Sequence, residues 1–553
     1  MDKILKLDFN ERCDKSSPLT DNLPVGDSLW QYPERQPLEQ IIAEQNGLSV
    51  NQVLCTNGGD EAIMILMRMI NEGIKLILPL PAFSQYTWGI KSWQLTADVI
   101  QAKDDLSINI EETRQAIIEN DRSVTVLTRP NNPTGESIAY DDLIGIIQLA
   151  KENNGWIFLD EAYIEFSDET SLTETLAAKK GLSQFDNLVI LRTFSKAYGL
   201  AGIRLGYLLG TELLIEQFRV RCMPFNLSAP SIKIAKEALR KTNQTEMKNY
   251  CKQIKKNRAI LFDRLTSLGI NVFPSQANFL FMTLPNNQAK AVKSFMAKNN
   301  ILLRSFDDTG LTNSLRITIP FEIKKLLELL KQCLQPQLVC MDMDGVLIDT
   351  SGSYDQCVLA TVKQLSGIKI SIESVEVLRC QGGFNNDWVL SKQLLDNLGF
   401  NLDLEQVTQV FQLLYLGKNK DGLVANEKSI ISSKLVNQIK QSNNTQFTIV
   451  TGRPRKEARF GQALVDLSEL ELISLDDVKQ GKPSPEGIQK LQLKYSNSSW
   501  MCGDNPDDMQ AAVGSNSLAI GIGEGKVDSL YQAGADIVLK NINELEKWLC
   551  PLK

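Results

Sequence analysis

The chain contains the stretch LVILRTFSKAYGLAGIR at residues 188–204, where an aliphatic run leads directly into a loop with one lysine. Residues 188–191 read as a buried strand of a parallel sheet. Lys196 follows the end of that strand, where its amine could form a Schiff base with a carbonyl cofactor. Two hydroxyls and a guanidinium beside it could hold a phosphate group: Thr193, Ser195 and Arg204. On its own, a solvated loop would account for the same residues.

Four other motifs place polar residues at the predicted ends of strands or at the start of a helix. They are NGGDE at 57–61, PAFSQY at 81–86, NNPTG at 131–135 and FLDEAY at 158–163. Backbone amides at a helix N-terminus can bind an anion, and an acid at the carboxyl edge of a parallel sheet is often functional. Helix capping, turn formation and core packing explain the same letters one motif at a time.

In this order, the five motifs resemble those of fold-type I pyridoxal-phosphate aminotransferases, and more closely those of the histidinol-phosphate aminotransferase family. QYPE at 31–34 and SLRIT at 314–318 extend the resemblance, which covers roughly residues 5–333. The resemblance implies the large and small domains of that fold, with pyridoxal 5'-phosphate as cofactor. It also implies transamination of imidazole-acetol phosphate with glutamate, and a homodimer formed through this part of the chain.

The resemblance assigns roles to individual residues. Lys196 is similar to the Schiff-base lysine that shuttles the proton, and Asp160 to the acid that pairs with the pyridinium nitrogen. Asn132 and Tyr163 would hydrogen-bond the ring oxygen O3′, and Tyr86 would stack on the ring. The cofactor phosphate would be held by Gly59, Asp60, Thr193, Ser195 and Arg204.

Residues for the substrate and the partner subunit follow from the same resemblance. Arg316 is similar to the arginine that binds the glutamate carboxylate, and Arg304 to a second anion contact. Tyr32 is similar to the residue that reaches the cofactor of the partner subunit. Gln31 stands where the family commonly has arginine, and Arg129 precedes Pro130 where Ser-Pro is usual. These two departures concern substrate contacts and leave the transaminase core intact.

A break in the pattern separates two parts of the chain. An amphipathic helix is predicted over 322–334, and Pro336 interrupts it because proline cannot continue a helix. A new strand begins at 338. Aliphatic runs at 124–127, 156–159, 338–341, 447–450, 500–502 and 518–520 alternate with helical patterns, which is typical of α/β folds with mostly parallel strands. We expect domains at 1–333 and 338–553, joined by a linker at 334–337.

The second part carries acids directly after predicted strands. In DMDGVLID at 342–349, two carboxylates one residue apart could share a cation while one attacks phosphorus. An EF-hand calcium loop would need further acids and a closing glutamate, which are missing. TGR at 451–453, GKPSP at 481–485 and MCGDNPDD at 501–508 follow. Together the four motifs resemble those of the haloacid dehalogenase-like hydrolases, with a Rossmann-like core over 338–553.

By this second resemblance, Asp342 is the nucleophile that forms an aspartyl-phosphate, and Asp344 is the general acid and then the general base. Thr451 and Lys482 would bind the transferred phosphoryl group. The Mg²⁺ site would comprise Asp342, Asp344, Asp504 and Asp508, with Asp507 a less favoured ligand. Residues from about 351 to 442 read as a helical cap between the first two motifs. Arg379, Gln381 and Asn385 are candidates for substrate contacts there, and equally ordinary surface polar residues.

Composition excludes several kinds of chemistry. The 553 residues include no histidine, which excludes Ser-His-Asp triads and histidine-containing zinc sites. The net charge of -7 argues against a nucleic-acid partner, and the ten cysteines form no C-x-x-C pair. The apolar runs are too short to cross a bilayer, and the N-terminus lacks the apolar region of a signal peptide. The cytoplasm is the expected location, with small molecules as partners.

The leading hypothesis is a bifunctional enzyme of histidine biosynthesis. Its first part would make histidinol phosphate and its second part would hydrolyse that phosphomonoester to histidinol. Alternatively, the phosphatase serves an unrelated small ester such as phosphoglycolate, or the aminotransferase serves another amino acid. A third hypothesis is a scaffold protein without catalysis, which the intact residues Lys196, Asp160, Asp342 and Asp344 argue against.

Overall fold

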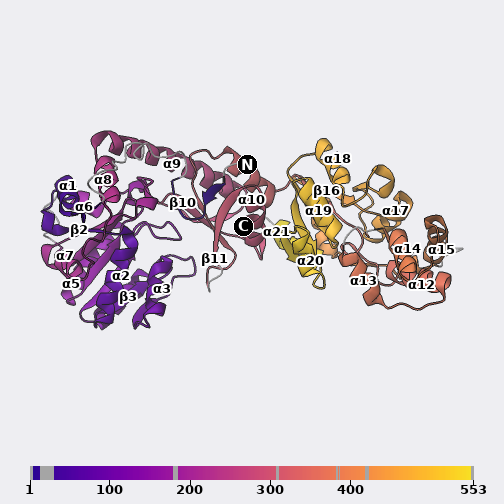
Figure 1. The fold of residues 1–553 in the computed structure, drawn as a ribbon, viewed down its shortest axis with the longest axis horizontal. Helices are drawn as coiled ribbons and strands as arrows, with labels where there is room; N and C mark the ends of the chain where they lie inside the picture. The colour runs from indigo at the N-terminus through magenta and orange to yellow at the C-terminus, as the bar shows by residue number, and fades with distance from the viewer. Residues whose placement is uncertain are drawn as a thin grey trace. The chain divides into compact units, whose positions relative to one another are not determined.

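The computed structural model (Figure 1) describes residues 4–12, 30–177, 185–306, 310–381, 384, 386–417 and 422–549. The chain forms two compact units. The first comprises Met1–Thr283, Ile301–Phe306 and Ser314–Ile323, and the second comprises Leu284–Asn300, Asp307–Asn313 and Lys324–Lys553. Among the residues described, no helix has the length and apolar character needed to span a bilayer.

A seven-stranded sheet, in the order β2-β8-β7-β6-β5-β3-β4, forms the centre of the first unit. Its strands are β2 Val53–Thr56, β3 Lys75–Pro79, β4 Ala97–Ile100, β5 Ser123–Thr128, β6 Trp156–Asp160, β7 Leu188–Thr193 and β8 Gly206–Gly210. Neighbours among β3 to β7 pair in parallel, whereas β8 is antiparallel to β2 and β7. Every residue of β5, β6 and β7 is buried, as expected where helices cover both faces. The strands predicted at 124–127, 156–159 and 188–191 are confirmed.

Two apolar clusters pack on the two faces of this sheet. Phe158 and Leu191 lie in the cluster beneath α2 and α3, whereas Leu159 and Ile190 lie in the cluster beneath α1 and α8. Side chains therefore alternate between the faces along each strand. The helices of this unit are α1 Gln36–Asn46, α2 Gly58–Asn71, α3 Ser84–Ser92, α4 Ile110–Glu119, α5 Tyr140–Glu152, α6 Leu172–Ala177, α7 Glu212–Arg219, α8 Ala229–Ala238 and α9 Lys241–Ser267.

A smaller mixed sheet, in the order β1-β11-β12-β10-β9, completes the first unit. Its strands are β1 Leu5–Leu7, β9 Asn271–Val272, β10 Phe279–Thr283, β11 Ile301–Phe306 and β12 Ser314–Thr318. β1 pairs with β11 in parallel, and the other pairs are antiparallel. Arg304 and Arg316 stand opposite each other on β11 and β12.

The second unit is built on a six-stranded parallel sheet, in the order β17-β16-β13-β18-β19-β20. Its strands are β13 Leu338–Met341, β16 Gln446–Val450, β17 Glu471–Ile473, β18 Ser499–Gly503, β19 Leu518–Ile522 and β20 Ile537–Leu539. The helices around it are α16 Ser433–Gln441, α17 Arg455–Leu464, α18 Glu486–Lys494, α19 Pro506–Gly514, α20 Val527–Gln532 and α21 Glu546–Leu549. The strands predicted in this part of the chain are confirmed.

Four helices, drawn together in orange in Figure 1, have an apolar core of their own: α12 Tyr354–Ser366, α13 Ile372–Cys380, α14 Asp387–Asn397 and α15 Leu404–Leu416. The chain enters and leaves this cap through a two-stranded antiparallel ribbon, β14 Ile348–Asp349 with β15 Lys428–Ser429. The sequence predicts no strand in the cap, because strands of two residues are too short to show a period. α16, which the predicted cap range includes, contacts α21.

Two helices that precede the hydrolase-like sheet belong to the second unit: α10 Gln288–Lys298 and α11 Lys324–Leu334. The indole N–H of the fully buried Trp500 on β18 donates to the Gln332 carbonyl, at 2.8 Å. Lys298 Nζ lies 2.6 Å from the buried carboxylate of Asp536, which also accepts from Ser294. The domain boundary predicted at 334–337 stays a prediction, but these contacts cross it.

Candidate active sites

The carboxyl ends of β5, β6 and β7 line a cavity of about 230 Å³ in the first unit. Each strand contributes one polar residue to it: Thr128, Asp160 and Thr193. Lys196 enters from the loop after β7, and Asn132 from the loop after β5. The five sequence motifs therefore meet because parallel strands end at the same edge of a sheet.

Asp160 is the buried acid of this cavity. Its carboxylate accepts from the Tyr86 hydroxyl at 2.9 Å and from the Ala162 amide at 3.0 Å. Burial raises the pKa of Asp160 to about 6, and these two hydrogen bonds only partly oppose the effect. A cationic group placed beside Asp160 would remove much of this penalty.

Lys196 is the amine of the cavity. Its Nζ donates to the Phe9 carbonyl at 2.9 Å and lies 5.7 Å from the centre of the Tyr163 ring. The side chain is only half-buried and lines the cavity. Lys196 and Asp160 thus occupy one cavity, as the sequence predicts.

Asn132 links Tyr163 to Arg316. The Asn132 amide donates to the Tyr163 hydroxyl at 3.4 Å, and its oxygen accepts from Arg316 Nη1 at 2.6 Å. Arg316 Nη2 donates to the Asp8 carbonyl, while its buried Nε–H has no partner among the residues described. Burial lowers the pKa of Arg316 to about 10. Arg316 does not itself line the cavity, and its contact with the site runs through Asn132.

The same cavity presents donors for an anion. Gly59 and Asp60 form the first turn of α2, where backbone N–H groups point outward. Arg204 forms an ion pair with Asp60, and the Thr193 and Ser195 hydroxyls lie 3.0 Å apart. All five residues line the cavity, so the donor set predicted for the cofactor phosphate is assembled.

In the second unit, three of the four acids predicted as metal ligands lie together. Carboxylate oxygens of Asp342, Asp504 and Asp508 all lie within 4.8 Å of one another, and no other such cluster occurs among the described residues. Asp342 follows β13 directly, and the other two stand after β18, its parallel neighbour. Oxygen ligands in this number suit Mg²⁺.

Two lysines offset the charge of these acids. Lys482 Nζ lies 2.8 Å from Asp342 and 2.5 Å from Asp508, and Lys526 Nζ lies 2.8 Å from Asp504. Burial alone would lower the pKa of Lys482, but the two carboxylates outweigh burial and raise it above its ordinary value. Burial also raises the pKa of Asp342, against the attraction of Lys482. The carboxylate that follows β13 thus meets a lysine, within a cluster of acids that could hold a cation.

A model of the family described as aminotransferase class I and II matches residues 30–331, more than half of the chain. The chain belongs to this family. A second model, described as haloacid dehalogenase-like hydrolase, matches residues 336–516. The chain is therefore an aminotransferase of class I and II with a hydrolase domain C-terminal to it in the sequence. Both parts have the α/β architecture described above.

Two relatives of the aminotransferase part are named histidinol-phosphate aminotransferase. Histidinol-phosphate aminotransferase of Caldanaerobacter subterraneus subsp. tengcongensis is 31% identical over 295 residues, which cover 53% of this chain and 80% of that protein. Histidinol-phosphate aminotransferase 1 of Trichormus variabilis is 31% identical over 330 residues, covering 57% and 88%. A crystal structure of histidinol-phosphate aminotransferase from Sinorhizobium meliloti in complex with pyridoxal-5'-phosphate has a TM-score of 0.52 at 23% identity, covering 59% and 89%. That likeness shows the fold.

Some residues assigned to the aminotransferase site lie away from its cavity. Tyr86 is fully buried behind Asp160 and does not line the cavity, whereas Phe83 does, together with Phe9 and Tyr163. Tyr32 is 78% exposed and stacks on Phe225, with ring centres 4.5 Å apart. Arg304, on β11, is exposed. Gln31, near the start of the chain, is exposed as well. Phe83 is three residues from Tyr86 in the same motif, and only the fold shows which ring faces the cavity.

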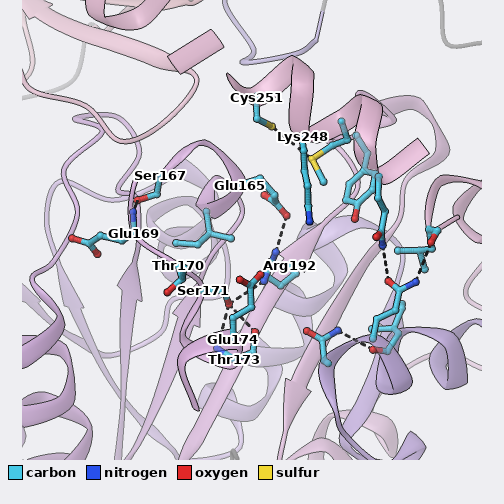
Figure 2. Close-up of a pocket in the computed structure, with 18 of the residues that line it drawn as sticks. Glu165, Ser167, Glu169, Thr170, Ser171, Thr173, Glu174, Arg192, Lys248 and Cys251 are labelled. Atoms are coloured by element: carbon cyan, nitrogen blue, oxygen red, sulfur yellow. Dashed lines mark hydrogen bonds and ion pairs between the residues drawn. The ribbon is translucent and has the colours of Figure 1, made fainter. Parts of the chain in front are cut away.

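Arg129, a departure from the usual aminotransferase sequence, points to the other face of the sheet. It pairs with Glu169 and lies 3.8 Å from Glu161. Glu161 in turn lies 3.7 Å from Arg192, which binds Glu165 at 2.8 Å. Figure 2 shows the Arg192–Glu165 pair on the wall of a separate cavity of about 780 Å³. The guanidinium of Arg129 thus serves a buried ion cluster and does not reach the Lys196 cavity.

In the hydrolase domain, Asp344 is separate from the metal cluster. Its carboxylate accepts two donors of Arg453, with Nε–Oδ1 at 2.8 Å and Nη2–Oδ1 at 2.5 Å. Thr451 is buried at the end of β16, and its hydroxyl accepts from the Arg453 amide. Asp507 is buried on α19 outside the cluster. Arg453 belongs to the predicted TGR motif, but the motif alone gives it no role, because its partner Glu427 is 26 residues away.

The cap candidates differ in their surroundings. Arg379 is bound between Asp355 and Asp387, so its guanidinium is already paired within the cap. Gln381 is exposed, and Asn385 lies outside the described residues. The residues of both sites fit the groups that the families use. A buried acid, a lysine and an anion-binding helix end suit pyridoxal phosphate, and three clustered carboxylates suit Mg²⁺.

Proposed function

We propose that the first unit transfers the amino group of glutamate to imidazole-acetol phosphate and so makes histidinol phosphate. The observation that carries this proposal is the placement of Lys196, the buried Asp160 and a set of anion donors in one cavity. Relatives 31% identical, which bear the name histidinol-phosphate aminotransferase, support the choice of substrate.

Bound pyridoxal phosphate would supply an electron sink for the carbon that carries the amino group. Asp160 would pair with the ring nitrogen, since a cation there offsets the cost of its buried charge. Lys196 would anchor the cofactor and move the proton at the substrate Cα. Asn132 and Tyr163 would donate to the ring oxygen. Phe83, rather than Tyr86, would cover the ring face, while Tyr86 holds Asp160.

Arg316 would bind the glutamate carboxylate, because its Nε–H is buried and lacks an acceptor among the described residues. Arg304, opposite Arg316 in the sheet, would add a second positive charge. Tyr32 would reach the cofactor of a partner subunit, since its ring is exposed and lies outside its own cavity. We therefore propose a homodimer, in which the Tyr32–Phe225 surface contacts the second copy.

For the second unit we propose Mg²⁺-dependent hydrolysis of a phosphomonoester. An Asp342 oxygen would attack phosphorus, and the ester oxygen would leave with a proton from Asp344. Asp344 would then deprotonate a water that attacks the aspartyl-phosphate, releasing phosphate and restoring Asp342. Lys482 and Thr451 would bind the phosphoryl oxygens. Asp342, Asp504 and Asp508 would hold Mg²⁺, which leaves the Asp344 carboxylate for proton transfer.

Histidinol phosphate is the substrate we propose for this phosphatase, because it is the phosphomonoester that the first unit would release on the same chain. The experiment measures phosphate release by the full chain with Mg²⁺, from histidinol phosphate and from phosphoglycolate, with Asp342→Asn as control. A clear preference for histidinol phosphate supports the proposal. Preference for phosphoglycolate would assign the phosphatase to an unrelated ester.

We also propose a cytoplasmic location with small molecules as the only substrates. The cysteines in the described part of the chain are free, and most of them are buried, which is typical of proteins from reducing compartments.

A further inference from the structure

The cavity of about 780 Å³ in Figure 2, here called the Arg192 cavity, has no part in either proposed reaction. Its walls are the end of α1, the segment from the end of β6 to the start of α6, strands β7 and β8, and α9. Arg192 lines it, whereas the next residue, Thr193, lines the Lys196 cavity, because neighbouring residues of a strand point to opposite faces. The two cavities have no lining residue in common. Its volume is within the range of about 300–1,000 Å³ that is typical of small-molecule sites.

Two tyrosine hydroxyls line the Arg192 cavity without a hydrogen bond to any residue that the structure describes. Tyr207 of β8 is only 6% exposed, and Tyr198 is half-buried in the loop after β7. Phe194 fixes both rings, with ring centres 4.9 Å from Tyr198 and 5.8 Å from Tyr207. Burial raises the pKa of Tyr207 to about 12, so its hydroxyl keeps the proton at neutral pH. An acceptor on a ligand would supply the missing hydrogen bonds.

The charged side chains of the cavity are only partly paired. Three ion pairs involve its lining residues: Arg192 with Glu165, Lys255 with Asp168, and Arg129 with Glu169. Three other lining residues have no ion pair in the described part of the chain, namely Lys248 and Lys252 on α9 and Glu174 on α6. Figure 2 shows Lys248 extending from α9 into the cavity. The unpaired charge of the lining is therefore two cations and one anion.

We propose that the Arg192 cavity binds an acidic amino acid. Such a ligand carries two carboxylates and one ammonium group, which complement the two unpaired lysines and the one unpaired glutamate. Its carboxylates would lie near Lys248 and Lys252 and accept from the Tyr207 hydroxyl, and its ammonium group would lie near Glu174. This site goes beyond the proposed transamination, because it is separate from the Lys196 cavity.

The lining argues against ligands of a single charge. An anion without an ammonium group would be repelled by Glu174, and a simple cation would be repelled by Lys248 and Lys252. Buried apolar residues also line the cavity, among them Ile42 and Leu239, and could contact the short carbon chain of an amino acid.

The experiment measures how fast N-acetoxysuccinimide acetylates individual lysines of the full chain, by mass spectrometry, with L-aspartate or L-glutamate present. A ligand at about ten times its Kd should slow acetylation of Lys248 and Lys252 about tenfold, because only the unoccupied site reacts. Lys256, exposed on the same helix and outside the cavity, is the internal control and should react at an unchanged rate. Absence of protection by both amino acids would overturn the proposal, as would equal protection of Lys256.

Two related compounds test the charges of the ligand. Glutarate lacks the ammonium group, and L-glutamine lacks one carboxylate. Each should need at least about a fivefold higher concentration than L-glutamate for half-maximal protection of Lys248, because one ionic contact is lost. Protection by either compound at the same concentration as L-glutamate would overturn the assignment of an acidic amino acid.

Variants of the full chain test the site itself with the same measurement. Glu174→Gln and Tyr207→Phe should raise the L-glutamate concentration for half-maximal protection about three- to tenfold, because each removes one contact. Glu152→Gln, at an exposed position of α5 outside the cavity, is the matched control and should not change it. Lys196→Ala should also keep the protection. Loss of protection in Lys196→Ala would place the ligand in the Lys196 cavity and overturn the proposal, as would unchanged protection in both Glu174→Gln and Tyr207→Phe.

Discussion

At the scale of single residues, Asp160 and Lys196 owe their positions to strand ends. Asp160 is the last residue of β6, and its side chain points to the face that carries α2. The next residue, Glu161, points to the opposite face and joins the ion cluster of Arg129 and Arg192. A shift of one residue would exchange these two acids, so register decides which carboxylate meets a cofactor.

Asp160→Asn is expected to stabilise the cofactor-free protein at neutral pH. The folded-state pKa of about 6 lies above the ordinary 3.8, so the native state binds this proton more tightly than the unfolded chain does. The contribution of Asp160 to stability is therefore full below about pH 4 and is lost as the pH rises through about 6. We expect the variant to gain about 1–3 kcal/mol above pH 7 and little near pH 4. Urea unfolding of cofactor-free protein at both pH values measures the difference.

An equal gain at both pH values would mean that the amide acts through packing and not through charge. The same variant should bind pyridoxal phosphate more weakly, since the partner of the ring nitrogen has lost its charge. A titration followed by cofactor absorbance gives that affinity independently of stability.

Several site residues could be predicted from the sequence because each stands at a fixed place beside a strand end. Lys196, Asp342 and Thr451 are of this kind. Phe83 and Arg453 could not be predicted. The role of Phe83 depends on which ring of one helical turn faces the cavity. The role of Arg453 depends on Glu427, which the chain brings near only when it returns from the cap.

At the scale of elements, the start of α2 depends on a glycine. Gly58 has a φ of 71°, and a Cβ there would lie 2.6 Å from Arg204 Nη2. Gly58→Ala is expected to cost about 1–2 kcal/mol of stability and to displace Arg204 from the anion site. Affinity for pyridoxal phosphate should fall about tenfold, since a charge-assisted hydrogen bond to phosphate is weakened. Cofactor titration of the full chain measures the loss.

Gly202→Ala is the matched control for this variant. Gly202 lies in the one-turn 3-10 helix Ala201–Ile203 that directly precedes Arg204, and a Cβ on it would have no heavy atom within 4 Å. Its substitution should leave the cofactor affinity unchanged. A loss of affinity in Gly202→Ala equal to that in Gly58→Ala would show that the loop, and not the glycine at the helix start, controls the anion site.

Helix α10 is expected to stabilise the hydrolase sheet through one ion pair. Lys298→Met would leave the buried Asp536 carboxylate with Ser294 and the Ala519 amide as its donors among the residues described. We expect the free energy of unfolding to fall by about 1–3 kcal/mol, less than for a fully buried pair, because solvent screens the partly exposed Lys298. The temperature at which phosphatase activity is lost on heating should fall, and Lys290→Met, on the same helix, should leave it unchanged. A fall shared by both variants would indicate a general effect of charge on α10.

The sequence predicts α11 as an amphipathic helix, and that prediction is confirmed over Lys324–Leu334. Its apolar face, with Leu326, Leu330 and Cys333, is readable from the spacing. The sequence does not show which surface that face covers. Periodicity shows that one side of a helix is buried, but it does not show against which element the helix packs. The contacts of α11 with β18 therefore became visible only in the fold.

At the scale of the whole molecule, the two catalytic sites share no residue. Lys196→Ala is expected to abolish transamination, while Mg²⁺-dependent hydrolysis of p-nitrophenyl phosphate continues at the wild-type rate. The reason is that the amine belongs to one cavity and the acids Asp342 and Asp508 to another unit. Parallel assays of one preparation test this. Loss of both activities would show that the units depend on each other for folding.

The proposed reactions should form a relay. Transamination exchanges one amine and one carbonyl for another, so it is close to thermoneutral, whereas phosphomonoester hydrolysis in water is effectively irreversible. With imidazole-acetol phosphate and glutamate supplied, phosphate release should require pyridoxal phosphate. Asp342→Asn should stop that release and let histidinol phosphate accumulate, and chelation of Mg²⁺ should have the same effect. Accumulation of histidinol phosphate with the wild-type chain would assign the phosphatase to another substrate.

Helices α10 and α11 make the two parts of the chain costly to separate. Trp500 and Asp536 now satisfy their buried polar groups with Gln332, Ser294 and Lys298, which are encoded upstream of the hydrolase. A gene split at residue 335 would leave the Trp500 indole without the Gln332 carbonyl and Asp536 without Ser294 and Lys298, so the fusion is easier to keep than to reverse. Substitutions at 298 and 536 should consequently be inherited as pairs. A hydrolase domain expressed separately would need to include helices α10 and α11.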